Sequence, residues 1–202
     1  MTQQLYLNVD WSKSITFGVS QNDSVARIPL PDQSIDLIIT DPPYNLTSEA
    51  KARVHSEMVR VCRGDIIVFS PPENAWEFPG LTSRLFWVKS PSTKNYTKNY
   101  GRFVEMIFYY RRGASVWNKN LKWSNYTGVY EDIVVGDTGH EHEKPLSLIE
   151  RFVRIHSTPK QVILDPFCGS GTTLVAAKNL GRHYVGFDIN GELVEKVKER
   201  LI

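Results

Sequence analysis

The segment Gln161-Val-Ile-Leu-Asp-Pro-Phe-Cys-Gly-Ser-Gly171 decides the fold, because a short apolar run leads directly into a glycine-rich loop. The run has the length and β-branched content of a strand buried on both faces of a parallel sheet. The glycines permit a tight turn and let a ligand lie against the backbone. Residues 172–180 then read as a helix that ends before Gly181. A strand, a glycine loop and a helix in this order predict an α/β fold with a ligand site at the loop.

The loop favours an adenosine ligand without phosphates. A phosphate loop needs lysine after its last glycine, but Gly171 is followed by Thr172-Thr173. The third glycine of a dinucleotide fingerprint is replaced by Leu174. A second predicted strand, residues 183–187, ends at Asp188, where a carboxylate can accept both hydroxyls of a ribose. The alternative is a glycine turn with an unrelated surface acid.

A second motif, Asp41-Pro-Pro-Tyr44, ends the apolar run of residues 34–40. Consecutive prolines fix the backbone and remove two N–H donors, so the Asp41 carboxylate and the Pro42 carbonyl form a rigid pair of acceptors. Such a pair suits an exocyclic NH2 group, and Tyr44 can stack on the base that carries it. A plain strand-ending turn is the alternative.

Length and pattern predict one α/β domain over residues 1–202 with a mostly parallel, doubly wound sheet. The strand of residues 34–40 is expected beside the strand that leads into the glycine loop, and residues 15–19 are expected beyond the strand of residues 183–187. Residues 91–139 have weak periodicity and are predicted to be an inserted flap. The remaining predicted strands are residues 65–70, 85–89 and 104–111, and the predicted helices are 48–63, 145–155, 172–180 and 191–201.

Charge is unevenly distributed along the chain. The net charge is +2, but residues 84–122 carry nine basic side chains and one acid, Glu105, which gives +8. Aromatic residues are interleaved with these bases, a pattern typical of binding to a polyanion with stackable bases. A solvated surface above core aromatics is the alternative. Two cysteines exclude a disulfide framework, and no metal site is expected; His140-Glu-His142 is interpreted as a solvated loop.

Taken together, these motifs resemble those of the DNA amino-methyltransferases that act on adenine N6 or cytosine N4. Asp41-Pro-Pro-Tyr44 resembles their catalytic motif, residues 165–171 their cofactor loop, and Asp188 their ribose acid. The catalytic motif precedes the loop by 124 residues, which is the permuted order of the family's beta group. The resemblance implies a single Rossmann-like methyltransferase domain and S-adenosylmethionine as cofactor.

The resemblance also implies roles for individual residues. Catalytic roles fall to Asp41, Pro42, Pro43 and Tyr44. Lys144 and Pro145, before a predicted helix, are implied to lie beside the cofactor. The other cofactor-binding residues implied are Asp165, Pro166, Phe167, Cys168, Gly169, Ser170, Gly171, Thr172 and Asp188. The nucleic-acid-binding residues expected in and near the flap are Lys89, Lys94, Asn95, Tyr96, Lys98 and Arg102.

We therefore expect an enzyme of DNA methylation that transfers a methyl group to N6 of a flipped adenine. Asp41 favours adenine, because serine more often opens the cytosine-N4 motif. The alternatives are a cytosine-N4 methyltransferase and a catalytically silent nucleic-acid-binding protein of the same fold. With no predicted membrane span or secretory signal, we expect DNA but no membrane as partner, in the cytoplasm of a bacterial or phage-infected cell. A homodimer and a partner restriction enzyme remain open at this point.

Overall fold

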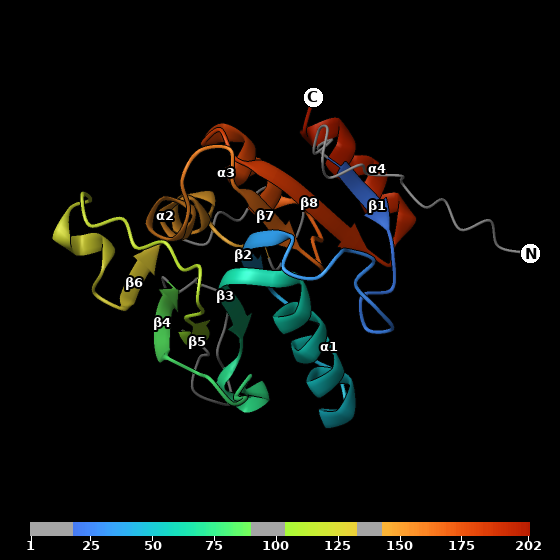
Figure 1. Cartoon of the computed structure of the whole chain (residues 1–202), viewed down its shortest axis with the longest axis horizontal. Helices are drawn as coiled ribbons and strands as arrows, with labels where there is room; N and C mark the ends of the chain where they lie inside the picture. The colour runs from blue at the N-terminus through green and yellow to red at the C-terminus, as the bar shows by residue number, and fades with distance from the viewer. Residues whose placement is uncertain (1–17, 90–103, 133–142) are drawn as a thin grey trace, which may run out of the picture.

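The computed structural model describes residues 18–89, 104–132 and 143–202. In this part of the chain, eight strands form one sheet in the order β1-β8-β7-β2-β3-β5-β4-β6 (Figure 1). The α/β class predicted from the sequence is confirmed. The strands are β1 (Gly18–Gln21), β2 (Ile35–Thr40), β3 (Cys62–Ser70), β4 (Ser83–Lys89), β5 (Val104–Tyr110), β6 (Val129–Asp132), β7 (Val162–Asp165) and β8 (His183–Asp188). The helices are α1 (Ser48–Val61), α2 (Leu146–His156), α3 (Thr172–Asn179) and α4 (Gly191–Arg200), with short 3-10 turns at Pro72–Asn74 and Trp123–Asn125.

Most neighbouring strands of the sheet run parallel. Only β5 is antiparallel to its neighbours, β3 and β4. The region predicted to be a flap contributes β5 and β6 to this sheet, and β6 pairs in parallel with β4. The sequence pattern did not predict β6, which has only four residues at the edge of the sheet.

Two predictions about strand neighbours are confirmed. Strand β2, which leads into the Asp41 motif, pairs in parallel with β7, which leads into the glycine loop; Leu37 lies opposite Ile163. At one edge of the sheet, β1 pairs in parallel with β8, and Gly18 lies opposite Val185. Of the predicted strand at residues 15–19, residues 15–17 lie outside the described part of the chain.

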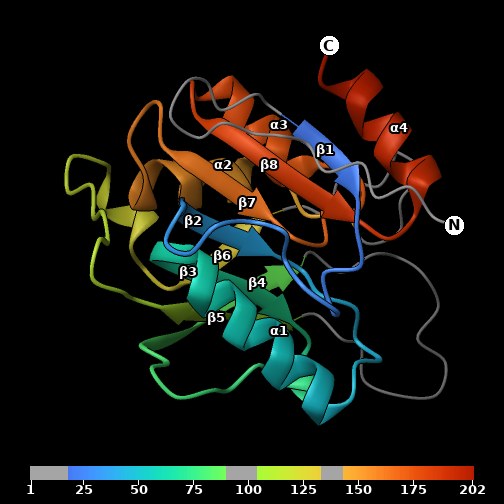
Figure 2. The same ribbon diagram turned by 45° about the vertical axis from the view of Figure 1, so that its right-hand side comes forward.

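Two apolar layers cover the sheet (Figures 1 and 2). On one face, Leu37, Ile39 and Ile67 pack with residues of α2, α3 and α4. On the other face, Ile38 and Ile66 pack with residues of α1. Alternating strand residues thus enter opposite layers, as expected for a sheet buried on both sides.

Helix α1 begins at a side-chain cap and ends earlier than predicted. The Thr47 side chain accepts a hydrogen bond from the backbone N–H of Ala50 at 3.2 Å. The predicted end at residue 63 is wrong, because Cys62 has an extended backbone and starts β3. The buried face consists of Val54, His55, Met58 and Val61.

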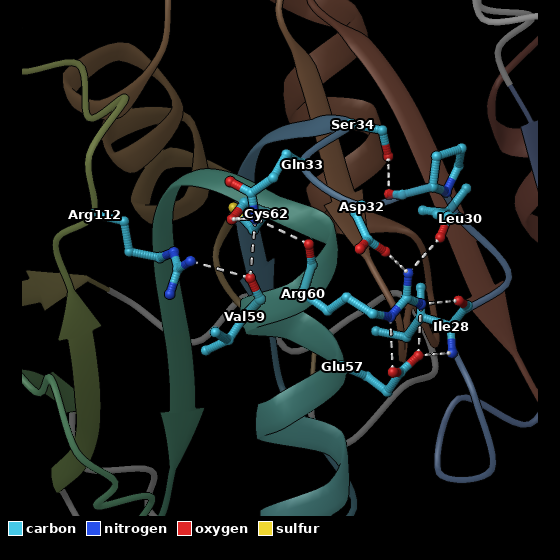
Figure 3. A network of polar contacts seen from close by, with 11 residues as sticks. Ile28, Leu30, Asp32, Gln33, Ser34, Glu57, Val59, Arg60, Cys62 and Arg112 are labelled. Atoms are coloured by element: carbon cyan, nitrogen blue, oxygen red, sulfur yellow. Dashed lines mark hydrogen bonds and ion pairs between the residues drawn. The ribbon is translucent and has the colours of Figure 1, made fainter.

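Arg60 fixes the loop before β2 onto α1 (Figure 3). Its guanidinium donates to the carbonyl oxygens of Ile28 and Leu30, both at 2.8 Å. It also pairs with Asp32 and Glu57, each at 2.7 Å. These contacts hold the segment that leads into the catalytic strand.

A topological switch point lies between β7 and β2. After β2 the chain crosses one face of the sheet in α1, and after β7 it crosses the opposite face in α3 (Figure 2). Ligands of open α/β sheets bind where such connections diverge, beyond the carboxyl ends of the strands. The Asp41 motif follows β2, and the glycine loop follows β7.

Candidate active site

A cavity of about 310 Å³ lies at this switch point. It brings together eight of the residues singled out in the sequence: Asp41, Lys144, Asp165, Phe167, Cys168, Gly169, Ser170 and Thr172. The remaining walls are Ile39, Thr40, Phe69, Glu143, Ile149, Thr173 and Leu193. Its lining combines polar groups with aromatic and aliphatic side chains, as is typical of small-molecule sites.

The two oxygens of the Asp41 carboxylate have different surroundings. Oδ2 contacts the Lys144 ammonium and accepts a weak hydrogen bond from the Tyr44 hydroxyl at 3.4 Å. Oδ1 is buried, and among the described residues it has no hydrogen-bond partner. A buried acceptor without a donor is costly, so Oδ1 is suited to an incoming N–H group.

Burial raises the pKa of Asp41 above its ordinary value, and the Lys144 ammonium acts in the opposite direction. Burial also raises the pKa of Tyr44. Tyr44 is therefore a neutral phenol, and with 41% of its surface exposed its ring is available for stacking. The neighbouring Pro42 is buried, whereas Pro43 is exposed.

Asp165 links the two halves of the site. Its Oδ1 accepts hydrogen bonds from the Thr40 hydroxyl at 2.8 Å and from the Phe167 N–H at 3.1 Å. Burial raises the pKa of Asp165 to about 6. Asp165 thus connects the end of β2 to the start of the glycine loop.

The glycine loop turns through two left-handed residues, Gly169 (φ +48°) and Gly171 (φ +82°). The N–H of Gly169 donates to Asp188 Oδ2 at 3.0 Å. A Cβ at Gly169 would meet no atom within 4 Å, so this cavity wall leaves open space for a ligand. Asp188, at the end of β8, is not among the residues that line the cavity. Its hydrogen bond with Gly169 holds the glycine loop, which does line the cavity.

Glu143 closes one side of the cavity and is tied to two other elements. Its Oε1 accepts from the Thr172 hydroxyl at 2.8 Å and pairs with Arg200 of α4 at 2.7 Å. Arg200 also donates to the Ser170 carbonyl at 2.9 Å. The segment before α2, the glycine loop and α4 are therefore coupled around the cavity.

The remaining sequence predictions fall outside the cavity or outside the described residues. Gly171 caps α3, Pro145 caps α2, and Pro166 is buried in the loop. Lys89 ends β4 and pairs with Glu105 at 2.7 Å. Lys94, Asn95, Tyr96, Lys98, Arg102 and His140–His142 lie outside the described residues.

Sequence reasoning missed Glu105, and it gave little weight to Glu143. Glu105 lies on β5, and its Oε1 is 3.0 Å from the Lys144 ammonium. Its one available signal was that it is the only acid within the basic stretch of residues 84–122. No group of three or more metal-binding side chains occurs in the part of the chain that is described.

Comparison with known proteins identifies the family. The model of the N6/N4 DNA methylases matches residues 66–199. The type II methyltransferase M.HpaI of Haemophilus parainfluenzae is 31% identical over 225 residues, spanning 85% of this chain and 69% of that protein. The chain belongs to the N6/N4 DNA methylase family. This methylase is therefore a DNA amino-methyltransferase.

Other relatives and solved structures agree with this assignment. The type II methyltransferase M.HinfI of Haemophilus influenzae is 24% identical, over 91% of this methylase and 67% of the relative. A crystal structure of an M1.HpyAVI–SAM complex aligns with a TM-score of 0.68 and 28% identity, covering 91% of this chain and 98% of that one. The cytosine-N4-specific PvuII methyltransferase aligns with a TM-score of 0.71, 91% and 86% coverage, and 17% identity, which shows the fold alone. In the described ranges, no helix is long and apolar enough to cross a membrane.

Proposed function

We propose that this chain methylates N6 of adenine in DNA, with S-adenosylmethionine as the methyl donor. The observation that carries the proposal is the buried Oδ1 of Asp41. This atom has no hydrogen-bond partner among the described residues, and Asp41 lines a cavity that the glycine loop also lines.

The cavity fits the cofactor. The open space at Gly169 leaves room for a ligand against the backbone. The carboxylates of Glu143 and Asp165 suit the positively charged amino group on the methionine part of S-adenosylmethionine. Phe167, Ile149 and Leu193 supply apolar surface for the adenine ring. Asp188 would accept the ribose hydroxyls. When bound, S-adenosylmethionine supplies an electrophilic methyl group on a sulfonium centre.

The residues after β2 would orient the target base. A base in duplex DNA must first leave the stack to reach this depth. Asp41 Oδ1 and the Pro42 carbonyl would then accept the two hydrogens of the amine, and Pro43 keeps the backbone rigid. Tyr44 would stack on the ring. Catalysis on this proposal is mainly positioning of the amine against the methyl group.

The surroundings of a second Pro-Pro sequence support adenine. The neighbouring parallel strand β3 ends at Ser70-Pro71-Pro72, the serine form typical of cytosine-N4 enzymes. Its hydroxyl is buried and donates to the carbonyl of Asn74 at 2.7 Å, within a local turn. Asp41 is therefore the acceptor presented at the cavity, which favours the adenine-type motif.

We further propose that residues 1–202 act as one methyltransferase domain, with residues 91–139 in DNA recognition. Lys94, Asn95, Tyr96, Lys98 and Arg102 would contact DNA, with Lys89 at their border. M.HpaI and M.HinfI are type II methyltransferases, so a role in restriction-modification follows the same proposal. The chain spans 64–69% of the length of three such relatives.

The test is product identification. The protein is incubated with S-adenosylmethionine labelled in its methyl group and with duplex DNA, single-stranded DNA or RNA, and the nucleosides are separated by mass. We expect labelled N6-methyl-2′-deoxyadenosine from DNA. Labelled N4-methylcytosine would overturn the choice of base, and cofactor binding without any transfer would favour a silent DNA-binding protein.

Asp41→Ala is the control variant for this assay. It should abolish transfer while leaving the affinity for S-adenosylmethionine, measured by calorimetry, within a few-fold, because the carboxylate serves the amine. Wild-type turnover in Asp41→Ala would remove Asp41 from the mechanism.

A further inference from the structure

Four charged side chains of alternating sign extend from the cavity into the sheet. The Lys144 ammonium contacts Asp41 Oδ2, and the same ammonium lies 3.0 Å from Glu105 Oε1. Glu105 Oε2 in turn lies 2.7 Å from the ammonium of Lys89. The four residues come from the end of β2, the segment before α2, β5 and β4, so tertiary structure alone brings them together.

The middle of this chain of charges is deeply buried. The side chains of Glu105 and Lys144 are only 3% and 8% exposed. Aromatic rings line the ammonium: Lys144 Nζ is 5.6 Å from the ring centre of Phe69 and 6.0 Å from that of Trp87. Removing two charges from water costs about as much free energy as their mutual attraction in the protein interior provides. A contribution to stability alone therefore does not account for this arrangement.

The arrangement separates the two oxygens of Asp41. Lys144 occupies Oδ2, while Oδ1 has no partner among the described residues. We propose that Glu105 is a positioning residue for methyl transfer: it holds the Lys144 ammonium on Asp41 Oδ2, which leaves Oδ1 to accept the target amine. This inference rests on the proposed function, because it assigns Oδ1 to that amine.

Glu105 is needed because a buried lysine with one carboxylate partner easily loses its proton. Burial lowers the pKa of Lys144, but the attraction of Asp41 and Glu105 outweighs this effect and raises the pKa above its ordinary value. If Lys144 became neutral, Asp41 could take up a proton, and a protonated carboxyl group would donate rather than accept. The groups that face Lys144 are Asp41 and Tyr44 after β2, Glu105 on β5, and the rings of Phe69 on β3 and Trp87 on β4.

The first test follows the proton on Lys144 and requires no turnover. Lysine labelled with carbon-13 at Cε is incorporated into the wild type and into Glu105→Gln, and the Lys144 signal is assigned with Lys144→Met. We expect the Lys144 signal to titrate at least one pH unit lower in Glu105→Gln than in the wild type. An unchanged titration in a folded Glu105→Gln protein would overturn the proposal whether or not the enzyme methylates adenine.

The second test measures whether Glu105 acts through Lys144. We expect Glu105→Gln to lower kcat at least tenfold, with a decline toward high pH that begins at a lower pH than in the wild type, and with unchanged affinity for S-adenosylmethionine. The double variant Glu105→Gln/Lys144→Met should be no slower than Lys144→Met alone. If kcat of the double variant fell by the product of the two single effects, Glu105 would act independently of Lys144, and the proposal would be overturned.

Glu77→Gln is the matched control. It makes the same chemical change at an exposed ion pair with Arg84 of β4, whose N–O distance is 2.6 Å. We expect wild-type kcat and an unchanged pH profile. A loss in Glu77→Gln equal to that in Glu105→Gln would attribute the effect to general charge and refute a specific role.

Discussion

Gly171→Ala should destabilise the protein well beyond the usual cost of replacing a glycine. Gly171 has φ +82°, and a Cβ there would lie 2.6 Å from Cγ1 and 3.1 Å from Cγ2 of Val197. The left-handed backbone costs an alanine about 1–2 kcal/mol. Forcing a methyl group into a packed core adds about 1–3 kcal/mol. The expected loss in the free energy of unfolding is therefore about 2–5 kcal/mol.

Gly181→Ala separates these two contributions. Gly181 also has a positive φ, +72°, but a Cβ there meets nothing within 4 Å. Urea unfolding should show a loss of about 1–2 kcal/mol for Gly181→Ala, from backbone strain alone. Equal losses in Gly171→Ala and Gly181→Ala would refute the argument from Val197.

A double variant tests the contact with Val197 directly. Val197→Ala removes both methyl groups that a Cβ at residue 171 would strike. Gly171→Ala combined with Val197→Ala should lose less stability than the sum of the single changes, by about 1 kcal/mol or more. Additive losses would place the cost of Gly171→Ala elsewhere.

The other predictions concern the cofactor, acid stability and DNA. Asp188→Ala removes the acceptor of the Gly169 N–H and the proposed ribose acceptor, so calorimetry should show an affinity for S-adenosylmethionine reduced roughly ten- to over a hundredfold; unchanged affinity in a folded variant would contradict the assignment. Burial lowers the pKa of His55 to about 4, so unfolding measured against pH should show stability complete above about pH 6.5 and falling by roughly 3 kcal/mol toward pH 4; a His55→Gln variant with the same pH dependence would contradict this. Neutralising Lys94 and Lys98 together should weaken binding to all DNA sequences and flatten the salt dependence by up to about two units; methylation confined to one site of six or more base pairs with weak salt dependence would refute the expectation of backbone-dominated binding.

Strand neighbours in the catalytic half were predictable because local patterns specify them. Continuous apolar runs ending at Asp41 and Asp165 identify buried parallel strands whose carboxyl ends meet at one edge. The short edge strand β6 was not predictable, since four residues carry too little periodicity and its pairing with β4 depends on tertiary context. The end of α1 was misjudged for the same reason, as Cys62 extends the helical pattern but pairs with Ile35 in the sheet.

The site itself divides in the same way. Asp41 and Gly169 could be predicted as site residues, because each belongs to a short motif of adjacent residues. The contact between Glu105 and Lys144 could not be predicted in this way, because the two residues are 39 positions apart and meet only when β5 and the segment before α2 are in place. Burial, which turns an ordinary glutamate into a partner of the catalytic carboxylate, is a property of the folded chain.

The hydrogen bond between Thr40 and Asp165 has a consequence for synthesis. It joins residues 125 positions apart, and in the described part of the chain β1 likewise pairs with β8, near the far end of the sequence. A nascent chain therefore carries β2 and its neighbour β3 long before the other neighbour of β2, strand β7, exists. Closing such long loops slows folding, and unpaired strands invite aggregation. The ability to modify DNA should thus appear in a growing chain only after β7 and β8 emerge from the ribosome, with no partly active precursor.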